Sequence, residues 1–132
     1  MLIRHEYNKR ENTFHNFVHG ATVMHGCYTL SKTDNVSAHL NIVMRFAMVF
    51  SGLVHDVDHT GKTNLYEINM RSKLATLYND RSVLEHHHLA IAYQILQCPG
   101  ADIFRNFDAA IRNEIRRYTI NNILATDNKF HF

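Results

Sequence analysis

Histidine and aspartate side chains gather in residues 55–59, which read His-Asp-Val-Asp-His and directly follow an apolar segment. Adjacent residues such as His55 and Asp56 cannot share one face of a helix, but at a helix end the backbone turns and both can point at one ion. Imidazole and carboxylate together suit zinc, manganese or iron, and a carboxylate can also bridge to a harder cation such as magnesium. This stretch, with Asp58 and His59 close behind, therefore predicts a metal site that carries out hydrolysis.

A second pair of histidines, His15 and His19, lies four positions apart. If the segment is helical, both imidazoles project from one face about one turn apart and can serve one site. Histidines at this spacing also occur at surfaces and as hydrogen-bonded core residues. The pair by itself is therefore compatible with either role.

Two further features have a structural and a functional interpretation. The sequence from Ser82 to Glu85 fits a capping box, in which Glu85 would bond to the start of a helix instead of serving a site. Residues 86–88 are three consecutive histidines, and consecutive helical residues face different ways. At most one of the three is expected to point at a shared site.

Helices are expected to position these residues, because helical apolar spacing recurs almost throughout and the chain has one proline and five glycines. We predict an all-α domain with helices over about 16–30, 36–54, 82–97 and from about 108, and shorter ones within 64–78. The helix at 36–54 is apolar nearly all round, so it is expected to be central. Residues 1–132 are interpreted as a single domain.

Composition excludes several classes of protein. A net charge of +2 without a run of lysine or arginine does not favour a nucleic-acid partner. The longest apolar stretch, residues 42–54, contains Arg45 and is too short to span a membrane. Cys27 and Cys98 form no disulfide framework, and the N-terminus lacks the features of a secretory signal. A reducing, cytoplasmic setting is expected.

Four motifs, taken together, resemble the catalytic domain of the class I 3′,5′-cyclic nucleotide phosphodiesterases. They are Phe-His-Asn-Phe-Val-His-Gly at 14–20, His-Asp-Val-Asp-His-Thr-Gly-Lys-Thr-Asn-Leu-Tyr at 55–66, Leu-Tyr-Asn-Asp-Arg-Ser-Val-Leu-Glu at 77–85 and Leu-Ala-Thr-Asp at 124–127. The resemblance extends from about Tyr7 to the last residue, with the motifs in family order. It implies a multi-helix, HD-type metal-dependent hydrolase.

The resemblance also implies roles for individual residues. His15 matches the family's general acid, which protonates the leaving 3′ oxygen. His19, His55 and Asp56 match three of the four protein ligands of a zinc ion, and Asp56 also bridges to a second metal, magnesium or manganese. The other matched positions lie around the metals, their waters and the phosphate: His59, Asn64, Glu85, His88 and Thr126.

The implied activity is hydrolysis of cAMP or cGMP to the 5′-monophosphate, which terminates a signal. Two alternatives remain open at this point. The chain could be a non-catalytic fragment that binds metal or another protein, or it could be an HD-type phosphohydrolase acting on a different phosphoester.

The chain departs from the family pattern in three residues and in length. Phe14, Gly20 and Asn128 stand where tyrosine, alanine and methionine are common. The family's domain continues further and there supplies the fourth zinc ligand, an aspartate, and the glutamine and phenylalanine that hold the purine. Spacing alone would make Asp127 the missing carboxylate, but it matches a different motif. We therefore expect a domain truncated on its C-terminal side, with a half-open pocket and exposed apolar faces that favour association.

Overall fold

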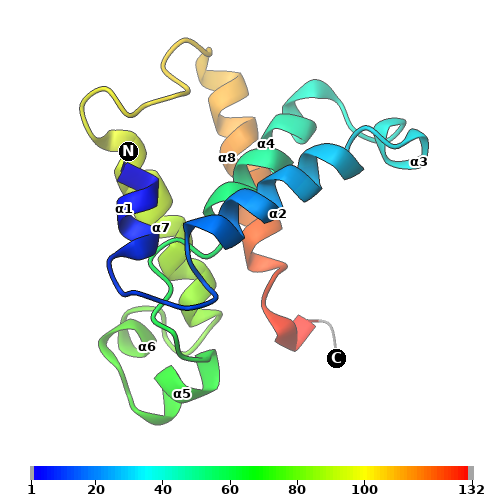
Figure 1. The fold of residues 1–132 in the computed structure, drawn as a ribbon. Helices are drawn as coiled ribbons and strands as arrows, with labels where there is room; N and C mark the ends of the chain where they lie inside the picture. The colour runs from blue at the N-terminus through cyan, green and yellow to red at the C-terminus, as the bar shows by residue number, and fades with distance from the viewer. Residues whose placement is uncertain (1, 131–132) are drawn as a thin grey trace.

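The computed structural model describes residues 2–130, and these form helices joined by loops, with no strand among them (Figure 1). The all-α prediction is confirmed. The elements are α1 (Leu2–Asn8), α2 (Phe17–Leu30), α3 (Asp34–Ser37), α4 (Ile42–Val54), α5 (Asn64–Asn69), α6 (Lys73–Leu77), α7 (Val83–Gln97), α8 (Ala109–Leu124) and a 3₁₀ turn, η1 (Asn128–Phe130).

Helix α4 lies at the centre of the fold, between α2 and α8 (Figure 1). Its residues Ala47, Phe50 and Val54 are buried and join a core that includes Ile115 and Ile123 of α8. The central position predicted from its nearly continuous apolar sequence is confirmed. Its C-terminal end therefore delivers the residues that follow it, from His55 onward, into the interior of the molecule.

The single helix predicted over residues 36–54 is wrong, because two helices, α3 and α4, are separated by a break at residues 38–41. Asn41 is extended, and its side chain accepts a hydrogen bond from the amide of Met44. An asparagine in this position satisfies one of the free amides of a first helical turn and so favours a new helix start. The other long helices have the predicted positions, with side-chain caps from Asn16 for α2 and Asp108 for α8.

The capping box predicted at Ser82 is also wrong. Ser82 has a left-handed backbone (φ 41°), and its hydroxyl donates to Asp127 instead of capping α7. The amide of Leu84, in the first turn of α7, instead donates to the side-chain oxygen of Asn64 at 2.9 Å. The helix is thus capped from α5, twenty residues earlier in the chain, and Glu85 is left for another partner.

The part of the chain that the structure describes contains no helix long and apolar enough to cross a membrane. Cys27 and Cys98 are both free, as expected.

Candidate metal centre

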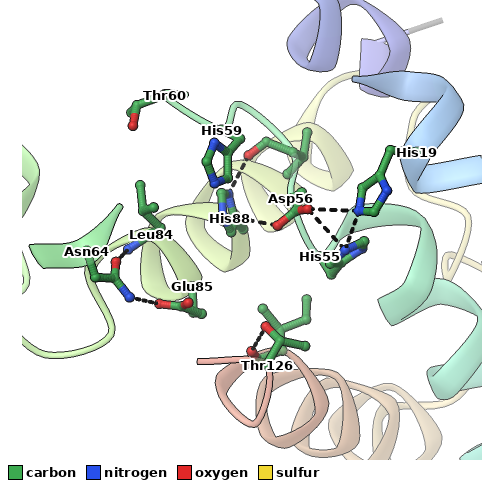
Figure 2. A network of polar contacts seen from close by, with 12 residues as sticks. His19, His55, Asp56, His59, Thr60, Asn64, Leu84, Glu85, His88 and Thr126 are labelled. Atoms are coloured by element: carbon green, nitrogen blue, oxygen red, sulfur yellow. Dashed lines mark hydrogen bonds and ion pairs between the residues drawn. The ribbon is translucent and has the colours of Figure 1, made fainter. Parts of the chain in front are cut away.

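Three side chains from two elements converge where α2 meets the end of α4 (Figure 2). His19 belongs to the first turn of α2, His55 follows the last residue of α4, and Asp56 comes next. The Nε2 atoms of His19 and His55 lie 3.2 Å apart, and each lies 3.1 Å from Oδ2 of Asp56. Three potential ligand atoms thus form a nearly equilateral triangle.

The His55 ring is oriented by its own helix, because Nδ1 lies 2.9 Å from the carbonyl oxygen of Gly52. A carbonyl only accepts, so Nδ1 carries a proton and donates it, which leaves the lone pair of a neutral imidazole on Nε2. An imidazole held in this way is typical of metal-ligating histidine.

The carboxylate and the two imidazoles shift each other's pKa values. Burial acts to raise the pKa of Asp56, but the hydrogen bond and charge of His55 hold it well below its usual range. Burial acts to lower the pKa of His55, yet the hydrogen bond and charge of Asp56 raise it; burial and the neighbouring imidazoles lower the pKa of His19. A divalent cation that bound these atoms would take the place of a proton on them.

A second group surrounds the other carboxylate oxygen of Asp56 and consists of His59 and His88. His88 is buried, donates from Nδ1 to the carbonyl of Val57 at 2.8 Å, and presents Nε2 to Oδ1 of Asp56 at 3.7 Å (Figure 2). Burial lowers its pKa to about 3, so this imidazole is neutral.

His59 differs from His88 in which nitrogen is free. Its Nδ1 accepts a hydrogen bond from the amide of Gly61 at 2.9 Å, so the proton of the neutral ring is on Nε2. Burial, with the neighbouring His15, lowers the pKa of His59 to about 4, which keeps the ring neutral. In this tautomer neither nitrogen has a lone pair free for a metal, so the first group is the better ligand set.

His15 does not lie on a helix, contrary to the geometry considered for the pair with His19. It precedes α2 in a bend, yet its ring centroid is 5.9 Å from that of His19, because the loop that carries it folds onto residues 55–61. The His15 ring stacks on His59 with centroids 3.8 Å apart and planes 9° apart. Asn12 anchors the same loop by donating to the carbonyl of His59 at 2.6 Å.

Asn64 and Glu85 are bonded to each other, with Nδ2 of Asn64 donating to Oε2 of Glu85 at 2.8 Å (Figure 2). Burial raises the pKa of Glu85, despite the hydrogen bond from Asn64. Thr126 is exposed just after α8, and its hydroxyl donates to the carbonyl of Ile123, which leaves its oxygen free to accept.

A cavity of about 740 Å³ opens beside these groups, a size suited to a small-molecule ligand. Most of the predicted site residues line it: His15, His55, Asp56, His59, Asn64, Glu85 and Thr126. The structure therefore brings the predicted residues together around one cavity, with His88 behind Asp56 and His19 beside it.

The residues fit a divalent metal. The atoms of His19, His55 and Asp56 lie within 4.8 Å of one another, and ligand atoms bound to one zinc at about 2.0–2.2 Å are a little over 3 Å apart. Two imidazole nitrogens and a carboxylate oxygen are ligands that zinc and related cations accept.

Asp58 is an aspartate of the same motif as Asp56, but its side chain faces away from this cluster. Its backbone is left-handed (φ 56°) and its buried carboxylate accepts hydrogen bonds from Nε of Arg10 at 2.6 Å and Nε2 of His87 at 2.8 Å. Lys9 adds an ion pair at 3.1 Å. Of the three consecutive histidines only His88 faces the cluster, as expected, whereas the ring of His86 stacks on Tyr78.

Sequence reasoning missed the residues that hold the site from outside the motifs: Tyr7, Arg10 and Asn12. Their partners lie 46–49 positions away in the chain, so periodicity and motif spacing carried no signal for them. Tyr7 is wholly buried, and burial raises the pKa of its phenol above its ordinary value, so the hydroxyl stays protonated.

Known proteins resemble this chain over nearly its full length. The sequence profile of the 3′,5′-cyclic nucleotide phosphodiesterases matches residues 14–132. The probable 3′,5′-cyclic-AMP phosphodiesterase pde-4 of Caenorhabditis elegans is 40% identical over 98% of this chain and 19% of its own length. The 3′,5′-cyclic-AMP phosphodiesterase 4C of Mus musculus is 42% identical over 89% of this chain and 17% of its own length.

A solved structure has the same fold. The phosphodiesterase domain of the RhoPDE fusion protein from the choanoflagellate Salpingoeca rosetta superposes with a TM-score of 0.91 at 41% identity, covering 98% of this chain and 40% of that chain. The chain thus spans about a fifth of the curated relatives and two fifths of the solved domain.

Proposed function

The chain belongs to the 3′,5′-cyclic nucleotide phosphodiesterase family, and from this we propose that it is part of a metal-dependent enzyme that hydrolyses cAMP or cGMP to the 5′-monophosphate and so terminates a signal. One observation carries the proposal. The potential ligand atoms of His19, His55 and Asp56 form a triangle beside a cavity that His15 lines. Each side chain has a distinct task in such a reaction.

His19, His55 and Asp56 would hold a zinc ion, and the second oxygen of Asp56, which faces His88, would contact magnesium or manganese. When bound, these cations supply Lewis acidity and make a water molecule more acidic. His55 supports this role through its bond to Gly52, which keeps the Nε2 lone pair available.

His15 is the proton donor in this proposal. The oxygen of a water molecule bonds to phosphorus and the water releases one proton to solvent, while the bond from phosphorus to the 3′ oxygen breaks. That oxygen takes a proton from the imidazolium of His15, which solvent then reprotonates. Histidine ordinarily titrates near neutral pH, and proton donation of this kind contributes about 100- to 10,000-fold in rate. The stack on His59 orients the His15 ring along the cavity wall.

The remaining residues orient waters and the phosphate. His59 presents a proton on Nε2, and His88 presents a lone pair beside Asp56. Asn64 and Glu85 hold each other at the cavity wall, and Thr126 offers a hydroxyl oxygen at its rim. Such outer partners fix the geometry of a metal site.

The test is turnover of cAMP and of cGMP by the chain supplied with zinc and magnesium, measured as 5′-monophosphate by chromatography. We expect turnover that falls by at least about 100-fold in His15→Ala. The matched control is His25→Ala, an exposed histidine on α2, which should leave the rate unchanged. An unchanged rate in His15→Ala would contradict the proposed role of His15, and zinc binding without any turnover would favour the alternative of a non-catalytic, metal-binding fragment.

A further inference from the structure

Tyr7 of α1 places its hydroxyl against the very end of α4. The residue is fully buried, and its hydroxyl donates to the carbonyl of Leu53 at 2.8 Å and accepts from the amide of Asp56 at 3.2 Å. One hydroxyl therefore contacts both the last turn of the helix and the ligand residue that follows it.

These two backbone groups need such a partner. The last carbonyls of a helix have no amide within it to donate to them, and an amide just beyond the helix costs free energy if it is buried without an acceptor. Tyr7 satisfies one group of each kind and so fixes where the chain turns out of α4. Because Asp56 presents one oxygen to each side of the cluster, the orientation of its backbone sets the position of both oxygens.

Gly20 makes room for this contact. It follows His19 on α2, and a Cβ at this position would lie 2.7 Å from the Tyr7 hydroxyl oxygen and 2.9 Å from the carbonyl oxygen of Leu53. Real Cβ atoms do not approach other atoms so closely, so a side chain here would require the Tyr7 ring or the end of α4 to shift.

We propose that Tyr7 is a positioning residue for the metal centre: its hydroxyl holds the Asp56 backbone so that His19, His55 and Asp56 bind one divalent cation. This inference rests on the proposed function for its cation. It adds one residue, which contacts neither the metal nor the substrate.

The experiment compares Tyr7→Phe with the unaltered chain. Zinc affinity is measured by competition with a chromophoric chelator, and hydrogen exchange of the Asp56 amide is measured by NMR in zinc-free protein. We expect Tyr7→Phe to lose about 10- to 100-fold in zinc affinity, as for other residues that orient ligands. Exchange at Asp56 should become faster, because its amide loses the Tyr7 hydroxyl as acceptor.

Two controls separate positioning from general stability. Tyr28→Phe removes the hydroxyl of an exposed tyrosine on α2 and should change zinc affinity by less than about twofold. Ile115→Val removes a buried methyl group in the core of α8 and should lower stability without altering zinc affinity or the exchange of Asp56 relative to its neighbours.

The outcomes distinguish the two proposals. Zinc binding that Tyr7→Phe leaves unchanged, together with unchanged exchange at Asp56, would overturn the positioning role alone. A chain that binds no zinc would contradict the proposed function and the positioning role with it. Tyr7→Phe keeps the buried ring and removes only the hydroxyl, so it tests the contact with Asp56 without opening a cavity.

Discussion

Asp56 and Asp58 lie two residues apart in one motif, yet their carboxylates have opposite surroundings. Asp58 is 3% exposed and meets two cations of the protein, Arg10 and Lys9, as well as His87. Asp56 meets only imidazoles, from His19, His55 and His88; within residues 2–130 no lysine or arginine lies within 4 Å of it.

The difference indicates which carboxylate can serve as a ligand. Burial acts to raise the pKa of Asp58, but hydrogen bonds from Arg10, His87 and Lys9 lower it to about 2, so its charge is neutralised within the chain. Asp56 is also ionised, but its neighbours are imidazoles that themselves offer lone pairs. A carboxylate without a cation from its own protein is suited to bind one from solution.

The largest expected effect is the difference in zinc affinity between variants of Asp56 and of Asp58. Asp56→Asn should weaken zinc binding by at least about 100-fold, whereas Asp58→Asn should weaken it by less than about 10-fold, as for an outer residue. Zinc at 100 times its dissociation constant should stabilise the unaltered chain by about 2.7 kcal/mol, and chelation should remove this gain. Chelator competition and thermal unfolding measure both, and equal losses in the two variants would contradict the distinction.

The second effect concerns stability without metal, and here we expect the substitution of Asp58 to cost more than that of Asp56. Asp58→Asn should lower the free energy of unfolding by about 2 kcal/mol, since it removes charged hydrogen bonds from a buried position. Asparagine tolerates the left-handed backbone of Asp58, so the change isolates the charge. Asp56→Asn should cost less than about 1 kcal/mol in urea unfolding with a chelator present, and a larger cost than that of Asp58→Asn would break the comparison.

A smaller effect ranks the two cations that neutralise Asp58. Arg10 approaches with Nε at 2.6 Å and Nη2 at 3.4 Å, whereas Lys9 makes one contact at 3.1 Å and is shared with Glu6. Both side chains are partly exposed, so solvent screens them. Arg10→Ala should therefore cost about 1 kcal/mol and Lys9→Ala less than about 0.5 kcal/mol in urea unfolding. The difference should shrink at high salt, and a larger loss for Lys9→Ala would be the contrary result.

The smallest effect concerns a third carboxylate, Asp127, which is held mainly by donors of the chain. Burial acts to raise its pKa, but the hydroxyl of Ser82 and the amide and ammonium of Lys129 lower it below the usual value. Its contribution to stability is thus present above the unfolded-state pKa of about 4 and is lost as the pH falls through the lower native value.

The test for Asp127 compares unfolding of the unaltered chain and of Asp127→Asn between about pH 3 and pH 6 in the presence of a chelator. The variant should lose part of the acid sensitivity below about pH 4, an effect of about 1 kcal/mol or less. Identical pH dependence in the two chains would show that Asp127 is not stabilised in the native state.

Several features of the fold could be predicted because their causes are local. The apolar run of residues 42–54 predicted the central helix, and the glycine and polar residues after it predicted the turn that carries Asp56. Asn41 is a local signal for the start of α4, but the predicted helix 36–54 ran through this residue. At Ser82 the local sequence was misleading. It favoured a cap from the Ser82 side chain, whereas Asn64 supplies the cap from a separate helix.

The sequence by itself determined the helical class, the identity of the donor atoms and the family, because periodicity, helix ends and motifs depend on residues close together in the chain. Only the tertiary structure decided that Asp56 faces the imidazoles while Asp58 faces Arg10, and that Tyr7 holds the Asp56 backbone. The physical reason is that a buried carboxylate takes the charge and hydrogen bonds that packing brings to it, and the partners on other elements lie 29–49 residues away.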